Sequence, residues 1–217
     1  VNQPGAAGVI AAEQVAKSAP DGYTLLIAGG SESTSLPNHK EVPYNLATSF
    51  RAIVHAIRLR MMIVTRTDSN IKTFKDLVAE AKANPGKLAY GTSGQGSLTH
   101  SMMLVVNKTI GIDTLHVPYK GDADVVRALV AGEIQIGTGS PDQFKPWIDS
   151  GKVIPLTLSS LDRFPGYPEV PTLKELGYDI YLENMKGIVA PAGLPDEIYE
   201  YLRDRFKKAM ETEAFKQ

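Results

Sequence analysis

The sequence predicts an α/β protein with mainly parallel strands. Stretches with an apolar residue every three to four positions alternate with short runs of β-branched residues along most of the chain. The 217 residues suit one large domain or two small ones, at about 150 residues per domain. Hydrophobic residues make up 43% of the sequence and charged residues 22%, as in ordinary globular proteins, which argues against a disordered, collagen-like or coiled-coil chain.

The N-terminal third is expected to hold one helix and three strands. An alanine-rich helix opens at 4–8 and ends at the turn 18–22, which contains Pro20 and Gly22. The expected strands are 23–28, 52–57 and 61–65, and a loop rich in Gly and Ser occupies 29–36.

The alternation continues through the rest of the chain. Thr73 and Asp76 match a capping box, which predicts a helix that ends at 84–86. Further strands are expected at 87–91, 114–117, 133–137, 153–158 and 185–190, and further helices after Ser97, at 122–131, at 141–149 and from Asp196 onward. Thr172 and Glu175 form a second capping box.

Composition excludes several classes of function. A net charge of -1 gives no positive field for nucleic acid, and no apolar run approaches the roughly 20 residues of a membrane span. The chain has no cysteine, which removes disulfides, cysteine-ligated metals and cysteine nucleophiles. The four histidines never occur at metal-ligand spacing, and no complete phosphate-binding or dinucleotide-binding motif occurs. We therefore expect no metal and no cofactor.

Four loops of small polar residues directly follow predicted strands. They are Gly29–Thr34, Gly91–Ser97, His116–Gly121 and Gly137–Ser140. Ligands of open α/β sheets bind at the carboxyl ends of strands, where glycines admit the ligand to the backbone and hydroxyl groups donate hydrogen bonds. A helix that begins in such a loop adds unpaired N–H groups and a positive dipole end. The loops therefore predict a site for a carboxylate that needs no full positive charge.

The candidate ligand-binding residues come from these loops. They are Ser31, Glu32, Ser33, Thr34, Thr92, Ser93, Gly94, Gly96, Ser97, His100, Tyr119, Gly139 and Ser140. For several of them the sequence leaves two roles open. Glu32 either meets a ligand amine or is solvated, His100 either orients the loop or is structural, and Tyr119 either contacts the ligand or packs as an ordinary aromatic side chain.

Eight short motifs follow one another along nearly the whole chain. They are Asn2–Gly8, Ala19–Leu26, Ala83–Leu88, Gly91–His100, His116–Gly121, Pro168–Thr172, Glu175–Gly177 and Gly187–Gly193. In this order they resemble the tripartite tricarboxylate transporter substrate-binding proteins, also called the Bug family. The resemblance implies a two-lobed periplasmic binding protein-like fold in which each lobe is an α/β sandwich and a ligand cleft lies between them. Lobe one would comprise residues 1–63 and 182–217, and lobe two residues 64–181.

The resemblance also implies a function. Such a protein captures a small carboxylate in the periplasm and delivers it to the permease subunits of a membrane transporter. We also expect the protein to act as a monomer and without a cofactor. A di- or tricarboxylate, an amino acid and an aromatic acid all stay open as ligands. The printed sequence shows no targeting signal and opens at what corresponds to the family's second strand. We therefore expect the first strand, the first helix and a Gly-rich loop of the family to be absent and the pocket of this chain to be half built.

Two alternatives belong to other functional classes. One is the effector-sensing domain of a transcription regulator, which would require an attached helix-turn-helix. The other is a serine hydrolase with Ser31 or Ser93 as nucleophile and His100 or His116 as general base. The nucleophile-elbow pattern G-x-S-x-G is nearly met at 29–33, but its last glycine is missing.

Overall fold

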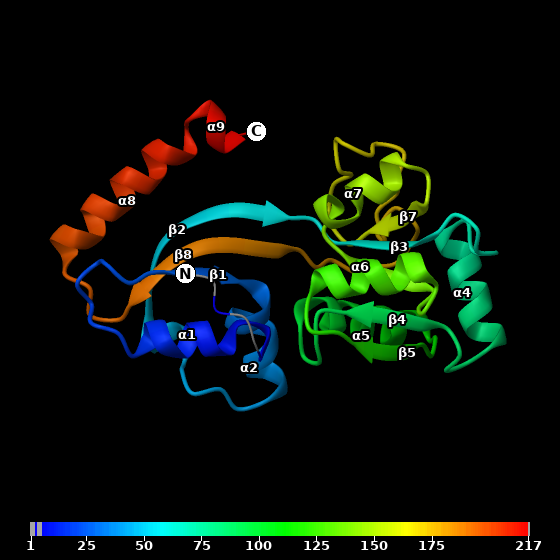
Figure 1. Ribbon diagram of the computed structural model, residues 1–217, viewed down its shortest axis with the longest axis horizontal. Helices are drawn as coiled ribbons and strands as arrows, with labels where there is room; N and C mark the ends of the chain where they lie inside the picture. Colours follow the sequence, from blue (N-terminus) through cyan, green and yellow to red (C-terminus); the bar gives the residue numbers. More distant parts are fainter. Residues whose placement is uncertain (1–2, 4–5, 217) are drawn as a thin grey trace. The chain divides into compact units, whose positions relative to one another are not determined.

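The computed structural model describes residue 3 and residues 6–216, and the chain forms two compact units (Figure 1). Unit 1 comprises residues 1–58 and 185–217, and unit 2 comprises residues 59–184. Each unit has its own β-sheet and its own apolar core. The lobe boundaries drawn from the sequence, 1–63 with 182–217 and 64–181, stay a prediction.

Unit 2 is built on a five-stranded sheet with the strand order β5-β4-β6-β3-β7. Its elements are β3 (Met62–Arg66), α4 (Phe74–Ala83), β4 (Ala89–Thr92), α5 (Leu98–Ile110), β5 (Leu115–Pro118), α6 (Asp122–Ala131), β6 (Ile136–Gly139), α7 (Pro141–Asp149) and β7 (Val153–Leu158). Strand β4 is parallel to β5 and β6, whereas β3 is antiparallel to β6 and β7. The α/β class is confirmed, but the expected parallel sheet is mixed because β3 runs opposite to its neighbours.

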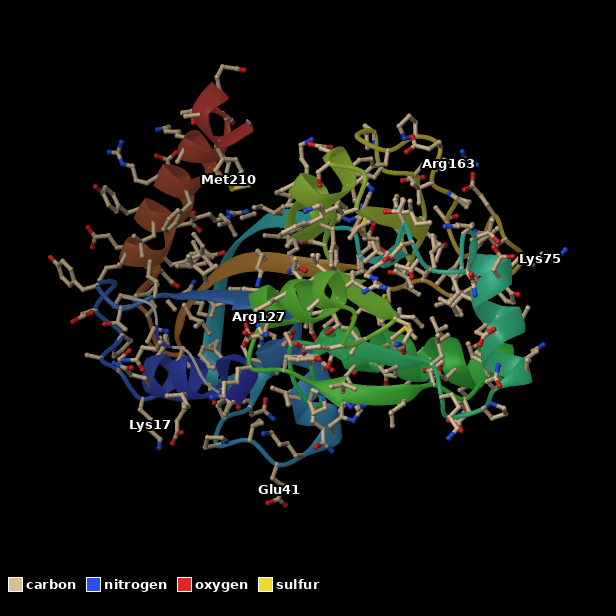
Figure 2. All side chains as sticks on the ribbon, turned by 45° about the vertical axis from the view of Figure 1, so that its right-hand side comes forward. Lys17, Glu41, Lys75, Arg127, Arg163 and Met210 are labelled. Atoms are coloured by element: carbon tan, nitrogen blue, oxygen red, sulfur yellow. The ribbon has the colours of Figure 1, made fainter. Side chains whose placement is uncertain are left out.

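Both faces of this sheet are buried by helices. On one face Ile63 and Tyr90 pack with α4 and α5, and on the other Met62 and Val64 pack with α6 and α7. Burial on both faces explains why residues 61–64 form a continuous apolar run instead of an alternating one. The outer faces of the helices are charged, as Lys75 on α4 illustrates (Figure 2).

Unit 1 has a three-stranded sheet with the order β1-β8-β2. Its elements are a 3₁₀ turn (Ala6–Gly8), α1 (Val9–Ala16), β1 (Leu26–Gly29), η2 (Ser31–Ser35), α2 (Leu36–His39), α3 (Leu46–Ser49), β2 (Phe50–Leu59), β8 (Asn184–Pro191), α8 (Asp196–Met210) and α9 (Glu213–Lys216). Helix α1 packs its buried Ala12 and Val15 against β1, and the apolar side chains of α8, such as Ile198, cover a second small core around Ile53.

Two sequence expectations in unit 1 are wrong. The strand expected at 23–28 begins only at Leu26, because the Asp21 carboxylate accepts the backbone N–H of Tyr23 and makes a turn there. Residues 29–36, expected to be a loop, contain the π-helical segment η2 (31–35), which continues into α2. The Tyr44 hydroxyl donates to the Glu32 carbonyl at 2.7 Å, a contact from outside the segment that holds it in place.

Local signals predicted unit 2 more closely. Helices α6 and α7 and strand β7 have the expected bounds, and the Thr73–Asp76 capping box is formed at the start of α4. Strands β4 and β6 each begin later than expected. The second capping box forms both of its hydrogen bonds, between Thr172 and Glu175, but the residues after it make a turn instead of a helix.

Candidate functional site

One edge of the unit 2 sheet collects three of the four polar loops that the sequence singled out. Because β5, β4, β6 and β7 run in the same direction, their carboxyl ends lie at the same edge, together with the amino end of β3. The loop 92–97 follows β4, Tyr119 follows β5 and Ser140 follows β6. The structure therefore brings these loops to one edge, where ligands of α/β sheets bind.

Thr92 is the centre of the hydrogen bonds in this loop. Its side chain is fully buried, and its hydroxyl lies 2.7 Å from Nε2 of His116 and 3.2 Å from the carbonyl oxygen of Gly94. The Gly94 amide in turn donates a hydrogen bond to the Thr92 hydroxyl at 3.4 Å. Through its carbonyl, Thr92 also accepts the backbone N–H of Tyr119 at 2.9 Å. Thr92 thus ties the loop to the neighbouring strand β5.

The loop ends in the N-terminus of α5. Ser97 is the N-cap residue, and its buried hydroxyl accepts the His100 amide at 3.3 Å and bonds the Thr99 hydroxyl at 3.0 Å. The Gly96 amide donates to Nδ1 of His100 at 3.1 Å. Gly94 and Gly96 have φ angles of 134° and 76°, which favour glycine at both positions. His100 therefore orients the loop, and Ser97 caps the helix that follows it.

His116 is stacked between two rings. The centroid of the His100 ring lies 4.0 Å away, and that of Tyr90 lies 5.1 Å away. Burial first, and the neighbouring His100 second, lower the pKa of His116 to about 4. His116 is therefore neutral near pH 7 and serves as a hydrogen-bond partner of Thr92.

The lowered pKa of His116 predicts a pH dependence of stability. Between pH 6.5 and 4 the unfolded chain binds a proton at this residue that the folded chain does not, so the free energy of unfolding falls as the pH falls. Because the ring is only partly buried, we expect a loss on the order of 1 kcal/mol. Urea unfolding at pH 7.5 and pH 4.5 should show a smaller loss for His116→Gln than for the wild type.

The control for this prediction is His55→Gln, which alters an exposed histidine of β2. This variant should lose as much stability on acidification as the wild type. Equal losses for His116→Gln and the wild type would show that His116 does not carry the effect.

The remaining candidates of unit 2 line the same edge. Ser93 is half-buried, and neither its amide nor its hydroxyl bonds another atom of residues 3 and 6–216. Ser140 is the N-cap residue of α7, but its side chain caps no amide of that helix. Gly139 faces Gln143 so closely that a Cβ atom would overlap the glutamine amide. Tyr119 packs its ring beside Gly91, and burial raises the pKa of its hydroxyl.

The candidates of unit 1 all lie on η2. Glu32 and Ser33 are buried, Ser31 is half-buried, and Thr34 is exposed. The Glu32 carboxylate accepts the backbone N–H of Gly29. Burial raises the pKa of Glu32, while that amide and the Lys186 ammonium oppose the shift. The sequence left a solvated Glu32 open, and that alternative is wrong because the side chain folds back onto its own backbone.

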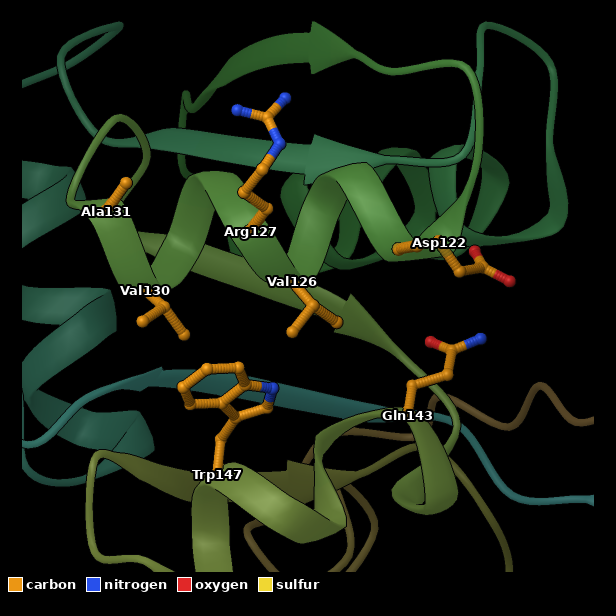
Figure 3. A pocket seen from close by; sticks show the side chains of 8 residues that line it. Asp122, Val126, Arg127, Val130, Ala131, Gln143 and Trp147 are labelled. Carbon is orange, nitrogen blue, oxygen red and sulfur yellow. The ribbon is translucent and has the colours of Figure 1, made fainter.

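A groove of about 660 Å³ lies between α6 and α7 of unit 2 (Figure 3). Its lining residues are mainly apolar: Asp122, Ala123, Val126, Arg127, Val130, Ala131, Gln143 and Trp147. The Trp147 indole faces Val126 and Val130 across the groove. The Nζ atom of Lys152 lies 5.4 Å from the centroid of the Trp147 ring. None of the lining residues belongs to the candidate set, so the groove is a feature apart from the loop 92–97.

The described residues offer little support for other chemistry. Within residue 3 and residues 6–216, no three His, Asp or Glu side chains are grouped to hold a metal ion. Across the same residues, every helix is too short or too polar to span a bilayer. Ser93 makes no hydrogen bond to a histidine of residues 3 and 6–216, and His116 bonds Thr92 instead, so Ser93 lacks the histidine partner that a hydrolase nucleophile needs.

Three contributions were missed in the sequence. In the sequence analysis His116 appeared only as a candidate general base of the hydrolase alternative. In the structure its ring bonds the Thr92 hydroxyl and orients that side chain. Lys186 and Tyr44 both act on Glu32, from 154 and 12 residues away along the chain. No local pattern could have found them, because sheet pairing and packing bring them together.

Comparison with known proteins identifies the family. A family model described as the tripartite tricarboxylate transporter family receptor matches residues 1–217. The chain is 36% identical over 210 residues to the "UPF0065 protein in gbd 5′ region" of Cupriavidus necator. That match covers 97% of this chain and 64% of the relative, so the chain spans less than two thirds of that protein's length.

Solved structures agree with this assignment. The periplasmic binding protein BugD has a TM-score of 0.90 and 29% identity, over 100% of this chain and 73% of that one. Rpa4515 of R. palustris, solved with adipate, has a TM-score of 0.91 and 27% identity, over 99% and 72%. The fold is that of the periplasmic binding proteins. The chain therefore belongs to the tripartite tricarboxylate transporter receptor family, which includes Bug proteins and consists of substrate-binding receptors and not of enzymes.

Proposed function

We propose that this protein binds a small carboxylate in the periplasm for a tripartite tricarboxylate-type transporter. The loop 92–97 carries the proposal, because it combines two glycines in left-handed conformations, the half-buried Ser93 and the N-terminus of the 13-residue helix α5. In this proposal the ligand carboxylate accepts hydrogen bonds from Ser93 and from amides of the loop. The proposed ligand class is a di- or tricarboxylate, an amino acid or an aromatic acid, and the proposed partners are the permease subunits.

The relatives favour a dicarboxylate within this class. Rpa4515, which shares 27% identity with this chain, was solved with adipate. The groups at the edge of the unit 2 sheet are hydroxyls and amides, which suit a carboxylate oxygen as acceptor. We therefore choose adipate as the first probe. Separately, we propose that the protein acts as a monomer.

Binding is tested with a thermal-shift screen of carboxylates followed by calorimetry. A ligand present at 100 times its Kd should stabilise the folded state by about 2.7 kcal/mol. The screen contains adipate, citrate, an amino acid and an aromatic acid, with matched uncharged amides as controls. Failure of every carboxylate to stabilise the protein more than its amide would contradict the proposal.

Ser93→Ala should weaken carboxylate binding by about 10- to 150-fold. A hydrogen bond to a charged group contributes about 1.5–3 kcal/mol, and each 1.4 kcal/mol is a factor of ten in Kd. The thermal midpoint of the free protein should stay unchanged, because Ser93 bonds nothing else in the described chain. Calorimetric titration with adipate measures the change, and Ser97 is left intact because its hydroxyl caps α5.

Ser150→Ala provides the matched control for this variant. Ser150 is an exposed serine at the end of α7, away from the loop 92–97 in the chain. It should leave the affinity for adipate unchanged. If Ser93→Ala binds adipate as tightly as Ser150→Ala does, the loop is not the carboxylate site.

A further inference from the structure

Arg60 differs from most arginines in the described chain because no carboxylate pairs with it. Arg51, Arg66, Arg127, Arg163 and Arg203 each have a carboxylate oxygen within 4 Å. The Nε atom of Arg60 is buried and has no hydrogen-bond partner among residues 3 and 6–216. Its guanidinium carbon lies 5.8 Å from the ring centroid of Phe164. Arg60 as a whole is half-buried, but a buried N–H group without an acceptor carries a desolvation cost, which an acceptor such as a carboxylate oxygen would offset.

The sheet register places Arg60 at the edge that carries the candidate site. Met62, two residues later, is opposite Gly139 of β6 and Leu158 of β7, where both strands end. The Ser159 amide donates to the Met61 carbonyl at 2.9 Å, which holds the chain at this edge. Arg60 therefore lies just beyond the amino end of β3, beside the carboxyl ends of β6 and β7.

The distance to the loop 92–97 suits a ligand with two acidic groups. Strand β3 is separated from β4 by β6 alone, so the two strands are about 10 Å apart at a spacing of about 4.8 Å. If one carboxylate of the ligand binds at Ser93, a second carboxylate several carbons away comes within reach of an arginine side chain at β3. Arginine matches a carboxylate with two parallel N–H···O bonds.

We propose that Arg60 binds the second carboxylate of the ligand and makes the protein selective for dicarboxylates over monocarboxylates of the same length. This inference rests on the proposed function, since it assigns the first carboxylate to the loop 92–97. The observations on Arg60 itself are its buried Nε, which has no partner among the described residues, and its position at the sheet edge.

The test compares adipate with hexanoate, which has the same number of carbons and a single carboxylate. Calorimetry on the wild type should show tighter binding of adipate than of hexanoate. Arg60→Gln should weaken adipate binding by tenfold or more and change hexanoate binding by less than twofold. Arg60→Lys, which keeps the charge but loses the paired geometry, should retain part of the preference.

Arg163→Gln is the matched control, because Arg163 is exposed and already paired with Glu175. It should alter neither affinity. Equal weakening of both ligands in Arg60→Gln would indicate a structural role and overturn the proposal, and so would unchanged adipate binding. In either case, retained hexanoate binding in the wild type would leave the proposed function standing. Failure of the wild type to bind either probe or any other carboxylate would contradict both.

Discussion

Replacing Phe144 by alanine is expected to lower the free energy of unfolding by about 3–5 kcal/mol. Phe144 is fully buried in unit 2, in the core that also contains Met62 and Leu129. Its ring lies directly beneath β6, where a Cβ atom on Gly137 or Gly139 would be 3.2 or 3.1 Å from it. The truncated side chain would leave a cavity there. Since small domains are stable by only about 5–15 kcal/mol, this is a large fraction of the total.

Urea unfolding measures the effect of Phe144→Ala. Trp147, the single tryptophan, lies one turn further along α7 and reports on this core by fluorescence. Lys145→Ala on the same helix is the control, because the ion pair of Lys145 with Asp149 is exposed and contributes at most about 1 kcal/mol. A loss below 1 kcal/mol in Phe144→Ala would mean that the unit 2 core is not packed as described.

Thr92→Val is expected to lower the free energy of unfolding by about 1–3 kcal/mol and to weaken carboxylate binding by at least tenfold. Valine keeps the shape of threonine but removes the hydroxyl, so Nε2 of His116 and the carbonyl of Gly94 lose their common partner. The loop 92–97 would then no longer be tied to β5 through this side chain. The two effects are measured separately, by urea unfolding and by calorimetry with adipate.

Thr92→Ser separates the hydroxyl from the methyl group. It retains the hydrogen bonds to His116 and Gly94 and should therefore bind adipate within about threefold of the wild type, with a stability loss of about 1 kcal/mol from the missing methyl group. Thr92→Val and Thr92→Ser should thus differ mainly in affinity. If both variants bind adipate equally, the Thr92 hydroxyl does not position the loop.

Local signals were sufficient for several elements. Helix α6 has acidic residues in its first turn and Gly132 in a left-handed conformation at its end, and α7 begins with Pro141 after Ser140. These features act within one turn of the chain, so the sequence predicted the bounds of both helices. The order of the motifs also predicted the family, which the match over residues 1–217 confirms.

Long-range contacts were needed where the expectations were wrong. Residues 31–35 are helical partly because Tyr44 reaches the Glu32 carbonyl, and no pattern within 29–36 contains that information. The reversed direction of β3 depends on its pairing with β6 and β7, which lie more than 70 residues further along the chain. Polar loops with serine and glycine are compatible with a turn or a helix until such contacts choose between them.

The sequence by itself determined the α/β class, the family and the identity of the glycine- and hydroxyl-rich loop after β4, because each depends on residues that are neighbours along the chain. Only the tertiary structure decided how that loop is held. It assigned Ser97 to the cap of α5, joined Thr92 to His116 and left the Nε of Arg60, at the same sheet edge, without a hydrogen-bond partner among residues 3 and 6–216. The reason is physical, since strand pairing and burial set which distant side chains meet and which polar groups stay unpaired.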